Sequence, residues 1–114
     1  MMTNFEKLRG RKLDVNYETG FHFEMTYLSD KKLKWKALYE VEEGEATEGV
    51  EPFYSYEISD GIYNINWIEQ EGMTVSQILD FNTGKVYAFL TWSDDDQRGG
   101  RNQLFQKGTF QFID

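Results

Sequence analysis

Residues 60–69 read DGIYNINWIE, and TVS at 74–76 and DFNTGKVY at 80–87 follow them. These segments predict three strands joined by two tight turns, because apolar residues alternate with polar ones and glycines lie between the segments. The alternation places Tyr63, Ile65, Trp67 and Glu69 on one face of the first strand. Glu69 is the unexpected member of this face, since burying a charge without a partner costs free energy.

The composition indicates one all-β domain. The chain has 114 residues, which fits a single domain spanning 1–114. Aromatic residues make up 17% of it, and such side chains favour strands. The lack of cysteine excludes disulfides, thiol catalysis and cysteine-bound zinc. No segment resembles a signal peptide or is apolar for the length of a membrane span, so we expect a cytoplasmic protein that does not act at membranes.

Turn signals rich in Gly, Asp, Asn and Ser recur along the chain at the spacing typical of antiparallel sandwiches and barrels. The last strand contains Gly108, where we expect a bulge or break. Eight strands in up-and-down order close into a barrel, and a two-sheet sandwich is the alternative. The expected strands span 11–17, 21–28, 32–40, 52–59, 62–69, 73–81, 85–92 and 102–113.

The net charge of −8 argues against nucleic-acid binding, because phosphate backbones repel such a surface. Lys32, Lys34 and Lys36 alternate, and we interpret them as one solvated strand face. The acidic segment 40–51 is either a lid at one end of the barrel or a connector. Residues 93–100 contain three adjacent aspartates but lack the alternating oxygens of a calcium loop, so we expect a plain surface loop.

The chain lacks the residues that most known types of catalytic site require. His22 is the only histidine, and it alternates with Phe21 and Phe23 in a way that turns it outward. No phosphate-binding or dinucleotide-binding motif is present. We therefore expect no metal site and no cofactor.

An aromatic cup containing one carboxylate remains as the candidate site. Desolvation would raise the pKa of Glu69, and we expect the Tyr17 hydroxyl within hydrogen-bonding reach of its carboxylate, as in a general acid. The alternative is a filled core with Glu69 reaching solvent at a strand end. The candidate ligand-binding residues are Val15, Tyr17, Phe23, Trp35, Tyr54, Tyr56, Trp67 and Glu69; Glu69 and Tyr17 are the catalytic pair if the protein is an enzyme.

The chain resembles the MoaF-like proteins over residues 10–92 or more. The residues that carry this resemblance are Gly10, the segment YETG at 17–20, Trp67 and the segment DFN at 80–82. The resemblance implies a lipocalin-like (calycin) barrel, and it implies no particular ligand.

A more distant resemblance is to the bacterial phenolic acid decarboxylases, in which two tyrosines, an arginine and a glutamate form the site. Glu69 matches the acid of that family and Tyr17 matches one tyrosine, but Val15 stands where the other tyrosine is expected. No Arg or Lys occurs at residues 37–60, where the family's arginine is expected. Without the cation a buried substrate carboxylate has no counter-charge, so we expect no decarboxylation.

These observations favour a binder of a small apolar or aromatic molecule inside the barrel. One alternative is a lyase or isomerase that uses Glu69 as acid and base. A second alternative is a protein-interaction module that acts through its outer face. The number of aromatic residues also exceeds what a small interior needs, so we expect a weak homodimer through surplus outer aromatics, with Phe53, Tyr87, Phe105 and Phe110 as candidates.

Overall fold

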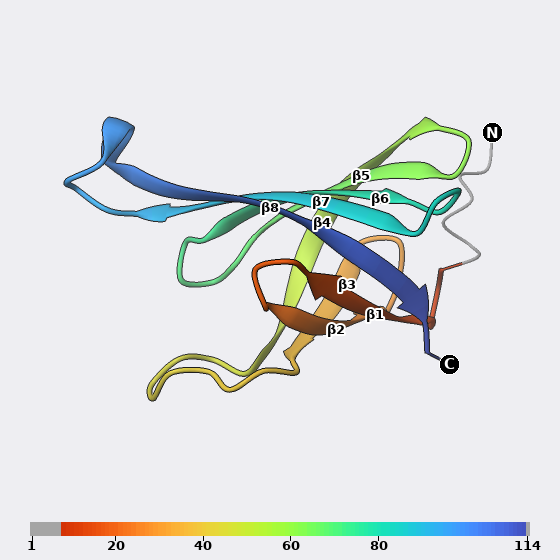
Figure 1. Cartoon of the computed structure of the whole chain (residues 1–114), viewed down its shortest axis with the longest axis horizontal. Helices are drawn as coiled ribbons and strands as arrows, with labels where there is room; N and C mark the ends of the chain where they lie inside the picture. The colour runs from red at the N-terminus through yellow and green to blue at the C-terminus, as the bar shows by residue number, and fades with distance from the viewer. Residues whose placement is uncertain (1–7, 114) are drawn as a thin grey trace.

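The computed structural model describes residues 8–113, which form a closed antiparallel barrel with its strands in sequence order. Among these residues no helix is long and apolar enough to cross a membrane. The strands, shown in Figure 1, are β1 (Lys12–Tyr17), β2 (His22–Tyr27), β3 (Lys32–Ala37), β4 (Glu48–Ser59), β5 (Ile62–Ile68), β6 (Thr74–Asp80), β7 (Lys85–Ser93) and β8 (Arg101–Phe112).

Pairing between the first and last strands closes the barrel. β1 pairs antiparallel with β8 from Leu13 opposite Phe112 to Tyr17 opposite Gly108. A two-sheet sandwich would leave these two strands unpaired, so the prediction of an eight-stranded up-and-down barrel is confirmed. Closure removes the exposed strand edges that favour aggregation.

Three details of the predicted strands were wrong. β3 ends at Ala37, whereas the predicted strand ran to residue 40. β4 begins at Glu48, so the last four residues of the acidic segment 40–51 belong to a strand. Their pairing with β3 outweighs the weak strand propensity of Glu and Gly. β8 runs without interruption through Gly108, which keeps its register with both neighbours. The glycine serves a close approach of β1 rather than a bend, because a Cβ atom there would lie 1.8 Å from the Asn16 carbonyl oxygen.

The barrel interior is divided along its axis into a packed half and an open half. Large, buried apolar side chains fill the half nearest the start of β1. In this half Tyr27 packs edge-on against Phe53, with 5.9 Å between ring centroids. The fully buried apolar members of this half are Leu13, Val15, Tyr27, Leu33, Ile65, Leu79 and Val86.

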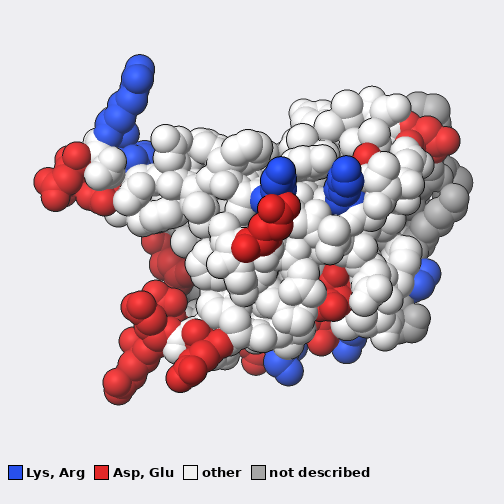
Figure 2. Space-filling view, viewed as in Figure 1, with Lys and Arg blue, Asp and Glu red and all other residues white. Residues whose placement is uncertain are grey.

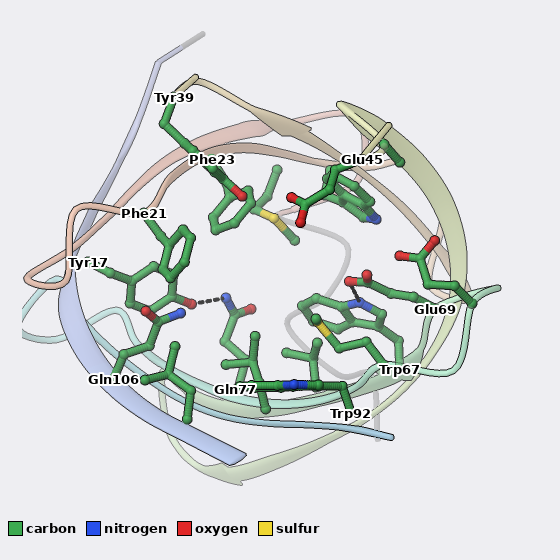
Figure 3. A pocket seen from close by; sticks show the side chains of 18 of the residues that line it. Tyr17, Phe21, Phe23, Tyr39, Glu45, Trp67, Glu69, Gln77, Trp92 and Gln106 are labelled. Atoms are coloured by element: carbon green, nitrogen blue, oxygen red, sulfur yellow. Dashed lines mark hydrogen bonds between the residues drawn. The ribbon is translucent and has the colours of Figure 1, made fainter. Parts of the chain in front are cut away.

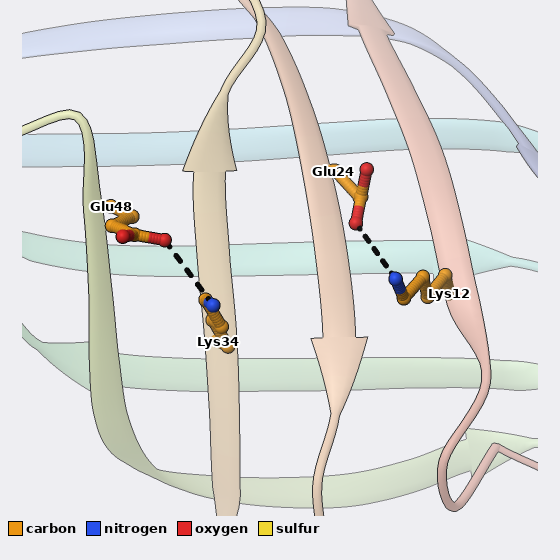
Figure 4. Close-up of polar contacts among 4 residues, drawn as sticks. All are labelled: Lys12, Glu24, Lys34 and Glu48. Atoms are coloured by element: carbon orange, nitrogen blue, oxygen red, sulfur yellow. Dashed lines mark ion pairs between the residues drawn. The ribbon is translucent and has the colours of Figure 1, made fainter.

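The outward residues of β1 to β3 are mainly charged and form ion pairs across neighbouring strands, one of them with Glu48 at the start of β4. Lys12 pairs with Glu24 at 3.3 Å and Lys34 pairs with Glu48 at 3.2 Å (Figure 4). His22 also lies on this outer surface, beside the Asp14 carboxylate, as its alternation with phenylalanines predicted. Exposed pairs of this kind contribute only about 0–1 kcal/mol each, so they mark the solvent face rather than stabilise it strongly.

The other side of the barrel exposes aromatic side chains and is the surface that a homodimer would use. Phe105 is 72% exposed, and it lies opposite the exposed Phe89 on the neighbouring strand. Phe53 and Phe110 are buried, so two of the four candidates for a dimer surface were wrong.

A weak homodimer stays a prediction, and sedimentation velocity tests it. We expect a species heavier than 13.5 kDa at micromolar concentration, and we expect Phe105→Ser to restore the 13.5 kDa species. Lys107→Ser on the same strand face is the matched control. A 13.5 kDa species at every concentration would contradict the prediction.

Candidate functional site

The open half of the barrel holds a cavity of about 620 Å³. Its mouth lies between the β1–β2 turn, the 38–47 loop and the β5–β6 turn, all at the end opposite the packed half. Figure 3 looks into this cavity. The lining residues are Tyr17, Phe21, Phe23, Met25, Trp35, Tyr39, Gly44, Glu45, Ala46, Trp67, Glu69, Glu71, Met73, Val75, Gln77, Leu90, Trp92, Leu104 and Gln106.

A group of aromatic rings forms one wall. Phe23 lies edge-on to Trp35, with 6.3 Å between ring centroids, and edge-on to Tyr39 at 5.5 Å. Phe21 packs against Tyr39 at 5.1 Å. These edge-to-face contacts hold the rings in place, so the wall is formed before any ligand enters.

The side of the cavity near β1 and β6 carries neutral polar groups. Gln77, 2% exposed, donates from Nε2 to the Tyr17 hydroxyl oxygen at 2.9 Å, and its own Oε1 has no partner among the described residues. Burial raises the pKa of Tyr17 to about 12, so its phenol stays neutral at ordinary pH. Nearby, the Thr19 hydroxyl donates to Gln106 Oε1 at 2.6 Å.

Glu69 occupies the other side of the cavity, where the β5–β6 turn positions it. Its backbone N–H donates to the Met73 carbonyl at 2.7 Å, and its carbonyl accepts from Gly72, whose φ of 103° suits glycine. Trp67 Nε1 donates to Glu69 Oε2 at 3.2 Å. The turn and the indole together aim the carboxylate into the cavity (Figure 3).

Three carboxylates influence one another on this side. Burial raises the pKa of Glu69 to about 7; the Trp67 hydrogen bond opposes this rise, while the charges of Glu51 and Glu71 add to it. Glu51, 6% exposed on β4, also has its pKa raised by desolvation. The raised pKa predicted for Glu69 follows from these causes, and the carboxylate is poised to change its charge near neutral pH.

Five of the eight predicted site residues line the cavity: Tyr17, Phe23, Trp35, Trp67 and Glu69. Val15 is fully buried in the packed half and does not line it. The placement of Tyr54 and Tyr56 inside was wrong, because both point outward and are 69% and 73% exposed. Phe53 pairs with Trp67 across the two strands, and that register sets the orientation of β4.

The expected contact between Tyr17 and Glu69 was also wrong. The two side chains lie on opposite sides of the cavity, as Figure 3 shows, because β1 and β5 are separated by three strands in either direction around the barrel. Tyr17 accepts a hydrogen bond from Gln77 instead, and Glu69 accepts one from Trp67.

Sequence reasoning missed Gln77 and Tyr39, which both line the cavity. Gln77 left a signal: it alternates with Val75 and Leu79 on the apolar face of its strand, so its amide had to be buried. Tyr39 left none, because it lies beyond the end of β3 in an irregular segment.

The charged residues that line the cavity are all acidic. They are Glu45, Glu69 and Glu71, and no described lining residue is Lys, Arg or His. Within residues 8–113 no group of three or more His, Cys, Asp or Glu side chains is arranged to hold a metal ion. The chemistry available is therefore apolar contact, hydrogen bonding and carboxylate charge.

Comparisons with known proteins agree with the fold. The model of the MoaF-like family matches residues 9–102. Among solved structures, the chain is similar to one described as "a putative beta-lactamase from Burkholderia vietnamiensis", with a TM-score of 0.78, 18% sequence identity and 99% of each chain covered. At that identity the likeness concerns the fold alone. No curated protein matches the chain.

Proposed function

The chain belongs to the MoaF-like family, and from the open cavity of its barrel we propose that it binds a small apolar or aromatic molecule there. The observation that carries the proposal is the cavity itself. Its volume of about 620 Å³ falls within the range of roughly 300–1,000 Å³ that small-molecule sites occupy. If the barrel interior served stability alone, we would expect its open half to be packed as densely as its other half.

The character of the lining supports the same function. Rigid aromatic rings form one wall, and a few polar groups from separate strands converge on the cavity. Gln77 in particular holds a buried acceptor without a partner among the described residues, which a ligand donor would satisfy. Ligand sites commonly combine an apolar lining with few polar groups of this kind.

A thermal-shift screen against a broad set of small aromatic molecules tests the proposal. We expect some of them to raise the melting temperature, since a ligand at a hundred times its Kd adds about 2.7 kcal/mol to the free energy of unfolding. A flat response across the whole set would contradict it.

A variant that fills the cavity locates the binding. Val75 lines the cavity and is 6% exposed, so Val75→Trp should place an indole in the open space and weaken binding at least tenfold. Leu104→Trp fills the cavity from another strand and serves if the first variant does not fold. Tyr54→Ser, at the exposed outer position, is the control and should leave binding unchanged. Equal binding by all three variants would place the ligand elsewhere.

Acid–base catalysis at Glu69 is a second candidate, favoured by a carboxyl whose pKa of about 7 matches the requirement of a general acid or base at neutral pH. Tyr17 does not face it, so a reaction would depend on Glu69 and the bound molecule alone. Mass spectrometry of a bound aromatic after incubation separates the two functions. An unchanged molecule supports binding, and conversion that disappears in Glu69→Gln supports catalysis.

A further inference from the structure

The charge inside the cavity has a single sign. Glu69 and Glu71 line it beside the β5–β6 turn, and Glu45 reaches it from the 38–47 loop. No described lining residue carries a positive charge. An anionic ligand would bring a further negative charge into a partly desolvated site, whereas a cation would meet carboxylates without competition from an internal Lys or Arg.

Gln77 gives an independent indication of a ligand that donates hydrogen bonds. Its side chain is buried, its amide nitrogen is engaged by Tyr17, and its Oε1 has no partner among the described residues. Gln77 lies deeper in the cavity than Glu69, on the neighbouring strand β6, with Trp67 between them (Figure 3). An unpartnered buried acceptor carries a desolvation cost that a ligand N–H or O–H removes.

The aromatic rings of the cavity can contact the apolar part of such a ligand, and they can also attract a positive charge on it. Trp67 holds the carboxylate through its indole N–H. Tyr39 lines the same cavity and packs edge-on against Phe23; burial raises the pKa of its phenol, and the charges of Glu45 and Glu69 add to that rise. Aromatic faces attract ammonium groups, so rings and carboxylates act on a cation in the same direction.

The approach to the cavity has the same sign of charge. Figure 2 shows carboxylates gathered on the two loops that project at the mouth end. They include Glu42, Glu43 and Glu45 on the 38–47 loop and Asp94–Asp96 before β8. Two cations are nearby, Arg98 and Arg101, and the Arg101 guanidinium donates to the Gly72 carbonyl of the β5–β6 turn. A net negative potential at a mouth raises the local concentration of cations and slows the entry of anions.

We infer that the ligand, within the binding function proposed above, is a protonated amine on an aromatic body. Its ammonium group is held at the Glu69 carboxylate, and its ring lies against Phe23, Tyr39 and Trp67. A hydrogen-bond donor at the far end of the ring system reaches Gln77 Oε1.

This arrangement couples binding to the release of a proton. The carboxylates of Glu51 on β4 and Glu71 on the β5–β6 turn repel the charge of Glu69, the Tyr39 phenol interacts with it electrostatically, and Glu45 lines the same cavity. None of these neighbours is a cation, so an arriving ammonium ion adds its attraction to the Trp67 hydrogen bond in favouring the ionised form. We expect amine affinity to fall with decreasing pH below about 7, the pKa of free Glu69.

Isothermal titration with matched ligand sets tests the inference. Each set keeps one ring and changes only the charge: tryptamine, 3-ethylindole and indole-3-propionate, with the corresponding phenyl and naphthyl compounds. At pH 8 and low salt we expect the amine of a binding set to bind at least tenfold more tightly than its neutral member, and the acid to bind most weakly. The amine preference should shrink as salt is added.

Variants then assign the preference to Glu69. Glu69→Gln should reduce the amine preference to less than about threefold and leave the neutral compound within twofold of its original affinity. Glu18→Gln makes the same charge change on the exposed β1–β2 turn at the same end of the barrel and should change neither affinity.

Neutral or acidic compounds that bind as tightly as the amines would overturn the amine inference and leave the proposed binding function standing. The inference also fails if only aromatics outside these sets bind. Failure of every aromatic in the broader screen would remove the binding function itself.

Discussion

Gly108→Ala is expected to lower the free energy of unfolding by at least about 3 kcal/mol, because overpacking against atoms that cannot move is among the most damaging core changes. A Cβ atom at this position would lie 1.8 Å from the Asn16 carbonyl oxygen and 2.7 Å from the Tyr17 Cα atom. All of these are backbone atoms of β1, so relief requires β1 and β8 to separate where they close the barrel.

Urea denaturation followed by circular dichroism measures this effect. Thr109→Ala, one residue further along β8 and exposed, is the matched control and should change the free energy of unfolding by less than about 1 kcal/mol. Gly49→Ala provides a second comparison, since its Cβ atom would meet the side chain of Trp35 at 2.8 Å rather than backbone. It should cost less than Gly108→Ala. Equal stability of Gly108→Ala and the wild type would show that β1 does not approach β8 as closely as described.

Glu69→Gln should have the opposite effect and stabilise the unliganded protein at pH 8. The unfolded chain releases the Glu69 proton near the ordinary pKa of 4.5, and the folded chain holds it until about 7. The folded state therefore loses stability relative to the unfolded state as the pH rises through this window. Glutamine keeps an acceptor for the Trp67 indole and removes the charge. With allowance for solvent screening, we expect a gain of about 1–2 kcal/mol above pH 7.

The pH dependence distinguishes this explanation from a general effect of charge. The melting temperatures of the wild type and Glu69→Gln should converge below pH 4.5, where Glu69 is largely protonated in both states, and diverge up to about pH 7. Glu18→Gln should show no such divergence. A Glu69→Gln protein that melts below the wild type at pH 8 would mean that the carboxylate stabilises the fold, and its role as a desolvated cavity group would be wrong.

The barrel could be predicted from the sequence because its strongest signals are local. The alternation from Tyr63 to Trp67 and the glycines at the turns fix the strands of the meander, and short turns leave few ways to connect them. The close approach at Gly108 was not predictable, because it depends on β1, some ninety residues earlier in the chain. A glycine in a strand looks the same whether it bends that strand or makes room for another.

The site was predicted in part for a similar reason. Trp67 and Glu69 share a face with buried residues on a strand with clean alternation, so both were placed correctly. In β4 each face carries both aromatic and polar residues, and the alternation of Phe53, Tyr54, Ser55 and Tyr56 does not tell which face is inside. Cross-strand pairing with Trp67 decides it, and pairing register is a property of the folded sheet. The contact proposed for Tyr17 and Glu69 failed because the sequence does not give distances across the barrel.

The two halves of the barrel interior divide its tasks between different sets of residues. The packed half, from Leu13 to Val86, is fully buried, while Tyr39, Met73 and Trp92 at the open end are only partly buried. We therefore expect substitutions at Tyr39, Met73 or Trp92 to leave the packing of the closed half unchanged, so that these positions can vary during evolution. A protein engineer can randomise those three positions together and sort the resulting library for new small-molecule specificities while the packed half of the barrel stays the same.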